Sequence, residues 1–134
     1  MLVLDTNTIS DDFRGDPKVV PRRQAVAPAD VGVPAVVEYE LRYGLLCLPQ
    51  EAAEPRLAAL AQLLRLMQKL PFDSECATEA ARLRAALEAA GTPIGPMDLL
   101  IAATALRHQA TLVTRNAREF SRVAGLQWVD WHGA

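Results

Sequence analysis

Four acidic residues stand at points from which a folded chain can bring carboxylates together. They are Asp5, Glu40, Asp98 and Glu119. Asp5 directly follows an apolar run, Asp98 opens a strongly apolar stretch, and Glu119 follows another apolar run. Because the carboxyl ends of parallel strands and the turns after them border a single crevice, we expect these four side chains to converge.

Converging carboxylates would need a cation, because like charges held close together disfavour ionisation. Oxygen ligands without histidine or cysteine favour Mg²⁺ or Mn²⁺. Mg²⁺ keeps several waters, and a bound water can be activated to attack a phosphodiester. The four acids therefore indicate a metal-dependent centre for phosphodiester hydrolysis. Each acid taken alone is better interpreted as a helix cap or an exposed charge, and for Asp5 the two interpretations are equally good.

Strands and helices must alternate for this convergence to occur, and the sequence predicts that they do. Short apolar runs favour strands at residues 1–4, 31–33, 70–72, 111–114 and 126–130. Apolar spacing and capping residues favour helices at 8–14, 38–46, 56–69, 75–90 and 98–106, with 49–54 as a charged connection and a short or delayed helix between Pro17 and Val26. We predict an α/β three-layer sandwich, with a parallel sheet of about five strands flanked by helices, in one domain covering residues 1–134.

Composition narrows the class of protein. Apolar residues make up 51% and charged residues 22%, as in ordinary globular proteins. The net charge of −2 argues against a uniformly basic nucleic-acid binder, although a local patch of arginines remains open. No apolar run reaches the roughly 20 residues of a membrane span, and the N-terminus lacks a signal-peptide pattern. We therefore expect a cytoplasmic protein. The two histidines and two cysteines show no zinc-type spacing.

Four segments, in order, resemble the motifs of the PIN domain. They are Leu4-Asp-Thr-Asn7, Glu38-Tyr-Glu-Leu-Arg-Tyr-Gly44, Ile94-Gly-Pro-Met-Asp-Leu-Leu-Ile-Ala-Ala103 and Leu112-Val-Thr-Arg-Asn-Ala-Arg-Glu-Phe120. The resemblance is to the VapC toxins of VapBC toxin–antitoxin pairs, and it covers nearly the whole chain. It implies a PIN-like fold, Mg²⁺-dependent endoribonuclease activity with Mn²⁺ as a possible substitute, and RNA, including tRNA, as substrate. It also implies a VapB-like antitoxin, and a homodimer or a toxin–antitoxin hetero-oligomer.

The resemblance also assigns roles to residues. Asp5, Glu40 and Asp98 match the three metal-binding acids of the family, and Glu119 joins them as a catalytic acid. The fourth polar position departs from the pattern, because Asn116 stands where many relatives have an aspartate. Either Asn116 or Glu119 completes the site. Thr6, Asn7, Thr114 and Asn116 are expected to support the carboxylates through hydrogen bonds, and Arg115 and Arg118 are expected to pair with RNA phosphates.

Two other functions stay open at this point. The first is a catalytically impaired PIN-like module that binds RNA or regulates, because Asn116 carries no charge. The second is a phosphoesterase with another substrate, such as a DNA nuclease, although the chain has no extra elements that would thread DNA.

Overall fold

A five-stranded parallel sheet organises the computed structural model, which describes residues 1–133. The strands are β1 (Leu2–Leu4), β2 (Val31–Pro34), β3 (Gln68–Leu70), β4 (Thr111–Val113) and β5 (Trp128–Val129). Their order across the sheet is β3-β2-β1-β4-β5, and every neighbouring pair is parallel. This confirms the predicted fold class.

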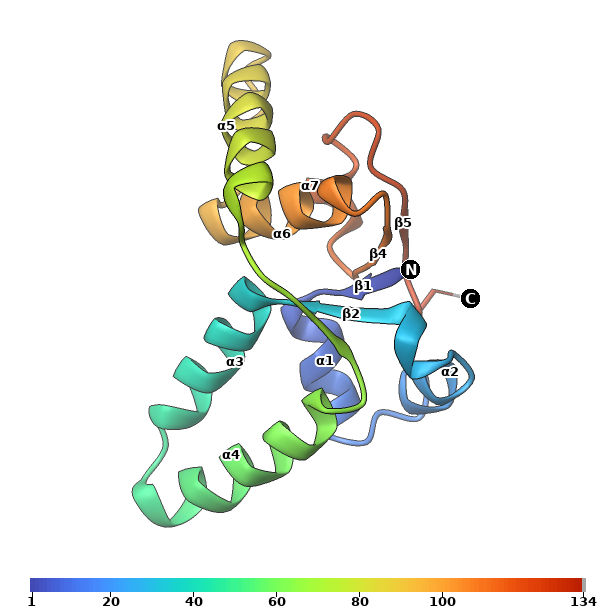
Figure 1. Cartoon of the computed structure of the whole chain (residues 1–134), viewed down its shortest axis with the longest axis vertical. Helices are drawn as coiled ribbons and strands as arrows, with labels where there is room; N and C mark the ends of the chain where they lie inside the picture. Colours follow the sequence, from blue (N-terminus) through green and yellow to red (C-terminus); the bar gives the residue numbers. More distant parts are fainter. Residues whose placement is uncertain (134) are drawn as a thin grey trace.

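Helices cover both faces of the sheet. The longer ones are α1 (Thr6–Phe13), α3 (Ala35–Leu46), α4 (Gln50–Leu64), α5 (Ser74–Ala89) and α6 (Pro96–Arg107). Shorter ones are α2 (Val20–Gln24), the 3₁₀ turn η1 (Pro28–Asp30) and α7 (Ala117–Phe120). Figure 1 shows α1 to α4 on one side of the sheet and α5 to α7 on the other. The α3–α4 hairpin and α5 project away from the sheet at opposite ends of the molecule.

The strand order reverses between β1 and β4, because the chain runs from β1 to β2 in one direction and from β4 to β5 in the other. In open α/β sheets, ligands bind outside the carboxyl ends of the strands at such a reversal. Asp5 follows β1 and Thr114 follows β4, so both border this crevice.

The core is built mainly from aliphatic side chains of the strands and of the helix faces that cover them. Val3, Leu4, Val33 and Leu112 are buried at its centre. Among the described residues, no helix is both long and apolar enough to cross a membrane.

The segment around α4 differs from the sequence prediction. Residues 49–54 were expected to be a connection, but α4 begins at Gln50, directly after Pro49. The first turn contains Glu51, whose charge is favourable at a helix N-terminus. The helix ends at Leu64 rather than 69, and β3 occupies Gln68–Leu70 rather than 70–72, because Lys69 pairs with Val33 in the sheet.

Pro34 also lies differently from the prediction. Strand β2 includes it, paired with Leu70, and α3 starts at the next residue rather than at 38. Proline is tolerated here because the strand ends at this residue and the same proline flanks the first turn of α3.

A buried ion pair joins α1 to α2. Arg23 donates from Nε to Asp12 Oδ2 at 2.7 Å and from Nη2 to Asp12 Oδ1 at 3.2 Å. The Asp12 side chain is 0% exposed and that of Arg23 15% exposed. The pair fixes the loop after α1, the helix whose first residues lie at the crevice.

Candidate active site

Asp5 is both a helix cap and a residue of the crevice. Its Oδ1 accepts a hydrogen bond from the Thr8 N–H at 2.9 Å, which caps α1. Its own N–H donates to the Val113 carbonyl at 3.2 Å, so β4 holds its backbone. The residue is only 5% exposed. The two interpretations of Asp5 are therefore compatible, since capping uses one carboxylate oxygen and leaves Oδ2 for another ligand.

Glu40 reaches the crevice from the first half of α3. Its Oε1 accepts a hydrogen bond from the Thr6 hydroxyl at 2.6 Å. Thr6 is the first residue of α1 and directly follows Asp5. This contact links Glu40 to the end of β1, although Glu40 lies 35 positions after Asp5 in the chain.

Asp98 and Glu119 form a carboxyl pair on the other side of the crevice. Asp98 lies in the first turn of α6, and Glu119 lies in α7. Glu119 Oε1 accepts from the Gly95 N–H at 2.8 Å, and Glu119 Oε2 accepts from the Asn116 side-chain amide at 2.9 Å. The same Asn116 nitrogen lies 3.5 Å from Asp98 Oδ2.

The charges of these acids interact strongly. Partial burial, a hydrogen bond with Glu119 and the carboxylates of Glu119, Asp5 and Glu40 raise the pKa of Asp98 to about 7. The hydrogen bond from Asp98 instead lowers the pKa of Glu119, helped by the Gly95 and Asn116 donors. The pair thus retains one proton up to neutral pH. The carboxylates of Glu119, Asp5 and Glu40 thus lie near enough to Asp98 to affect its ionisation.

We expect Asp98→Asn to stabilise the protein in the presence of a chelator. The full rise in pKa would correspond to about 4 kcal/mol, but water screens this half-buried group, so the expected gain is about 1–2 kcal/mol. Because the folded-state pKa is raised, ionisation of Asp98 weakens folding as the pH rises from its ordinary value of 3.8 to about 7. The gain should therefore be larger at pH 8 than at pH 5.

Thermal unfolding in EDTA at both pH values measures this gain. Asp30→Asn, at an exposed acid of η1, is the matched control and should leave the melting temperature unchanged. An Asp98→Asn protein that melts no higher than the wild type at pH 8 would contradict the expectation.

The donor set of the crevice fits a hard divalent cation. Its four acids offer carboxylate oxygens and no nitrogen or sulfur, and partial burial together with the nearby carboxylates raises the pKa of Asp98. Within residues 1–133, three ligand atoms come within 4.8 Å of one another only in a different cluster. No three acids of the crevice come this close among the described residues, so in this arrangement at most two of them would contact one cation directly and water would complete its shell.

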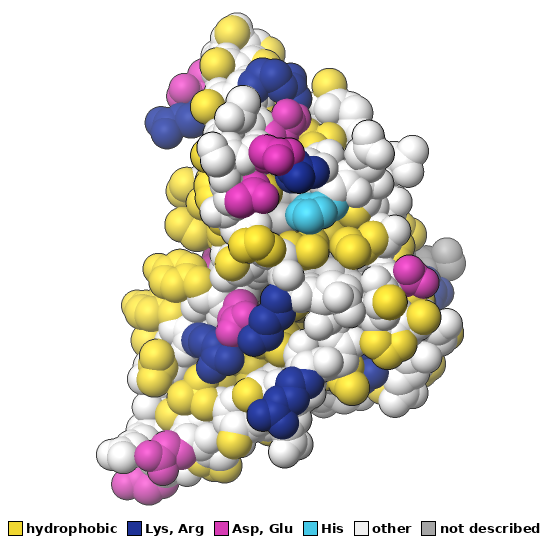
Figure 2. Space-filling view, in the orientation of Figure 1, with side chains coloured by type: hydrophobic (Ala, Val, Ile, Leu, Met, Phe, Trp, Pro, Cys, Tyr) yellow, Lys and Arg dark blue, Asp and Glu magenta, His cyan; other side chains and the backbone are white. Residues whose placement is uncertain are grey.

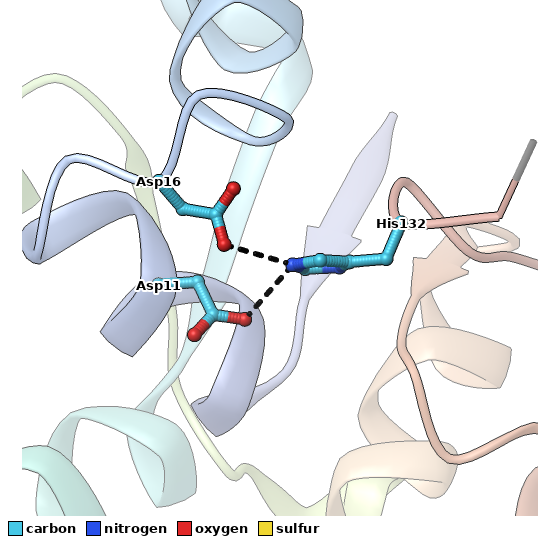
Figure 3. A group of neighbouring side chains, drawn as sticks. All are labelled: Asp11, Asp16 and His132. Atoms are coloured by element: carbon cyan, nitrogen blue, oxygen red, sulfur yellow. Dashed lines mark hydrogen bonds and ion pairs between the residues drawn. The ribbon is translucent and has the colours of Figure 1, made fainter.

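That different cluster contains Asp11, Asp16 and His132. Figure 3 shows the His132 ring nitrogen pointing at both carboxylates, with Nε2 3.1 Å from Asp16 Oδ2 and 3.3 Å from Asp11 Oδ2. The guanidinium of Arg115 also lies 3.3 Å from Asp11 Oδ2. A cation here would meet that positive charge, so we interpret the cluster as an ion-pair network that ties the C-terminal segment to α1.

The remaining predicted residues occupy varied positions. Thr114 is buried, and its Oγ1 accepts from the Asn116 N–H at 2.9 Å, so it supports the turn after β4. Asn7 is exposed and lines a groove beside the crevice. Arg115 is half-exposed and is held by Asp11, while Arg118 is exposed on α7.

Sequence reasoning missed the backbone donor of Gly95, whereas the Thr8 N–H is the donor that the interpretation of Asp5 as a helix cap implies. Thr8 has a local signal, since an aspartate three residues before it is the usual cap pattern. Gly95 has none, because its bond to Glu119 spans 24 positions of the chain.

A groove of about 710 Å³ extends from the crevice between α1, α3 and α4. Thr6 and Glu40 are among its lining residues, together with Arg14 and Arg56. Its apolar lining is provided by Phe13, Leu41, Leu45, Ala59 and Leu60. Elsewhere, Tyr39, Tyr43 and Leu46 are exposed along α3, and Figure 2 shows apolar side chains gathered at that edge, with basic and acidic side chains interspersed over the rest of the face.

Comparisons with known proteins agree with this arrangement. The family model of the PIN domain matches residues 2–126. A relative named tRNA(fMet)-specific endonuclease VapC, from Salmonella typhimurium, is 31% identical over 129 residues, with 96% of each chain covered. Ribonuclease VapC1 of Haemophilus influenzae is 32% identical over 131 residues, again with 96% of each covered. A solved structure of VapBC2 from Rickettsia felis, bound to a DNA fragment from its promoter, has a TM-score of 0.89 at 29% identity and covers 97% of this chain and 98% of that one.

Proposed function

The chain belongs to the PIN-domain family, among its VapC-type toxins, and on this premise we propose that it is a metal-dependent endoribonuclease that acts as the toxin of a type II toxin–antitoxin pair. The observation that carries the proposal is the convergence of Asp5, Glu40, Asp98 and Glu119 at the point where the strand order reverses. This placement is where an α/β sheet binds its ligand.

In this proposal Asp5 and Asp98 bind Mg²⁺ directly, with Mn²⁺ as a substitute. Glu40 and Glu119 complete the site through water or a second ion and orient the attacking water. A cation held there would supply a water of lowered pKa and would offset the charge that develops on the phosphodiester. Thr6 keeps the Glu40 carboxylate turned toward the crevice through its 2.6 Å hydrogen bond.

RNA is the proposed substrate. The relatives named as ribonucleases support this class, and the name of the Salmonella relative supports a structured RNA such as tRNA. Arg115 and Arg118 follow β4 at the border of the crevice, where their guanidinium groups can pair with phosphates. The Asp11 contact leaves the Arg115 side chain 53% exposed, so its free face remains available.

A cleavage assay tests this function. The purified protein should cut a tRNA pool with Mg²⁺ or Mn²⁺ and should stop when EDTA is added. Calorimetry with Mn²⁺ distinguishes the active enzyme from a catalytically impaired module. Such a module would bind RNA, but it would bind no metal and would not cut RNA. Glu119 favours the active enzyme over the impaired module. Its carboxylate lies next to Asp98 and provides the negative charge that Asn116 lacks.

The groove beside the crevice is the proposed site for the antitoxin. Its lining combines apolar side chains with the carboxylate of Glu40 and the guanidinium groups of Arg14 and Arg56, so it suits an apolar segment that also carries charged residues, among them a basic one to meet Glu40. Assembly in related proteins is supported by the VapBC2 complex. The chain itself is proposed to form a homodimer or a toxin–antitoxin hetero-oligomer, and the exposed residues Tyr39, Tyr43 and Leu46 provide apolar surface for assembly.

Gly44→Glu is expected to weaken antitoxin binding by about tenfold to a hundredfold, because it places a charge in the groove at a cost of about 1–3 kcal/mol. Gly44 lies on α3 with open space where a side chain would begin, so the change should not disturb packing. The test uses the proposed VapB-like antitoxin, and its affinity for the toxin is measured by calorimetry.

Ala58→Glu, on the exposed face of α4 outside the groove, is the matched control and should bind like the wild type. If Gly44→Glu also binds like the wild type, the antitoxin occupies another surface.

A further inference from the structure

We propose that Asn116 is a positioning residue that holds Glu119 against Asp98, and that Glu119 rather than Asn116 is the fourth oxygen donor of the metal site. This inference rests on the proposed function, because it assumes that the carboxylates of the crevice bind a cation. It decides between two candidates that the sequence leaves equal.

The side chain of Asn116 does not cap α7, although its position in the chain suggests that role. Asn116 is the N-cap residue of α7, a position where asparagine commonly accepts a hydrogen bond from the helix. Its side chain makes no such capping bond. Its backbone is fixed instead from the other side, by the hydrogen bond from its N–H to the buried Thr114 Oγ1 at 2.9 Å. The side chain is thereby free to point toward the acids.

The amide group of Asn116 suits a pair of carboxylates. An amide nitrogen carries two N–H donors, and here that nitrogen lies 2.9 Å from Glu119 Oε2 and 3.5 Å from Asp98 Oδ2. The first contact is a good hydrogen bond, and the second is at the outer limit of one. An aspartate at this position would offer no donor and would repel both acids.

Glu119 is held at both of its oxygens. Oε2 accepts from Asn116, and Oε1 accepts from the Gly95 N–H at 2.8 Å. Gly95 is the N-cap residue of α6, the helix that carries Asp98. The α7 segment is fixed to the same loop a second time, because Arg122 donates to the Pro93 carbonyl at 2.9 Å. Two elements separated in sequence are therefore aligned so that their carboxylates lie side by side.

This arrangement gives Asn116 and Glu119 different roles. Each carboxylate oxygen has two lone pairs, so Glu119 can accept these hydrogen bonds and still bind a cation. The Asn116 nitrogen faces the acids as a donor and cannot bind a cation in that orientation. Asn116 thus acts through Glu119, and removing both residues should cost little more than removing one.

A double-mutant cycle with direct metal binding tests this inference. Mn²⁺ affinity is measured by calorimetry without RNA for the wild type, Asn116→Ala, Glu119→Ala and the double variant. Partners that hold metal ligands are worth about tenfold to a hundredfold in affinity, so we expect Asn116→Ala to weaken binding by that factor and Glu119→Ala, which removes the ligand itself, to weaken it at least as much. The double variant should bind within about threefold of the weaker single variant, because the two residues act as one unit.

Gln62→Ala removes an exposed amide on α4 and is the control that should bind Mn²⁺ like the wild type. Circular dichroism checks that each variant is folded. If Asn116→Ala does not fold, Asn116→Leu, which matches the amide in shape, replaces it in the cycle.

Three results would overturn the inference: an Asn116→Ala protein with wild-type affinity, effects of the two changes that multiply fully, or a wild-type protein that binds no Mn²⁺. The proposed nuclease activity can also fail while this inference holds. In that case the wild type binds Mn²⁺ and the cycle shows the coupling, but no RNA is cut.

Discussion

Asp5→Asn and Asp98→Asn are each expected to lower the rate of RNA cleavage by about a thousandfold or more, since a catalytic metal contributes several kcal/mol to the transition state. Both changes remove a charge from the proposed metal site and keep the shape of the side chain. Asparagine caps helices about as well as aspartate, so Asp5→Asn should retain the hydrogen bond from Thr8 and the start of α1. The loss is therefore in chemistry and not in folding.

Single-turnover cleavage of labelled RNA, over a range of Mg²⁺ concentrations, measures this loss. Melting curves in EDTA provide the folding control, and there Asp98→Asn should be more stable than the wild type. Either variant cutting RNA at the wild-type rate, while EDTA still inhibits it, would show that the metal is bound elsewhere.

Arg23→Ala should lower the free energy of unfolding by about 3–5 kcal/mol, because it leaves a buried charge without a partner. The stranded group is Asp12, whose side chain is 0% exposed and accepts both hydrogen bonds of the guanidinium. Such a loss is a large share of the 5–15 kcal/mol that is typical of a domain. It would loosen α1 from α2.

Urea unfolding compares this variant with two others. Arg22→Ala, at the exposed neighbouring arginine, should change stability by less than about 0.5 kcal/mol. Asp12→Ala combined with Arg23→Ala should recover part of the loss, because it removes the unpaired charge as well. An Arg23→Ala protein as stable as the Arg22→Ala protein would mean that water reaches Asp12.

Local features of the sequence determined much of the architecture. Asp73 directly precedes α5 and is of a residue type that commonly caps helices, and its Oδ1 accepts from the Cys76 N–H at 2.9 Å. Gly91 lies just after the same helix, where glycine is common, and it adopts a φ of +72°, which side-chain-bearing residues rarely reach. The apolar runs of β1 and β4 are buried as predicted. These signals need only neighbouring residues, so they can be interpreted without the fold.

Boundaries that depend on distant partners were placed incorrectly. Residues 68 and 69 continue a helical pattern, yet they form β3 because β2 offers its edge for backbone hydrogen bonds. The gain from extending the sheet exceeds the small preference of two residues for helix.

The candidate site, like the fold, has features that the local sequence determines and features that depend on distant residues. The sequence by itself determined where the acids stand in the alternation of strands and helices, because apolar runs and the polar residues that end them are local properties of the chain. Only the tertiary structure decided what those acids contact. Three sets of contacts depend on the order of the strands. They are the Thr6–Glu40 bond, the Gly95–Glu119 bond and the contacts of Asn116 with Glu119 and Asp98. A hydrogen bond between residues far apart in sequence leaves no periodic trace, so the roles of Asn116 and Glu119 could be distinguished only once the sheet had brought them together.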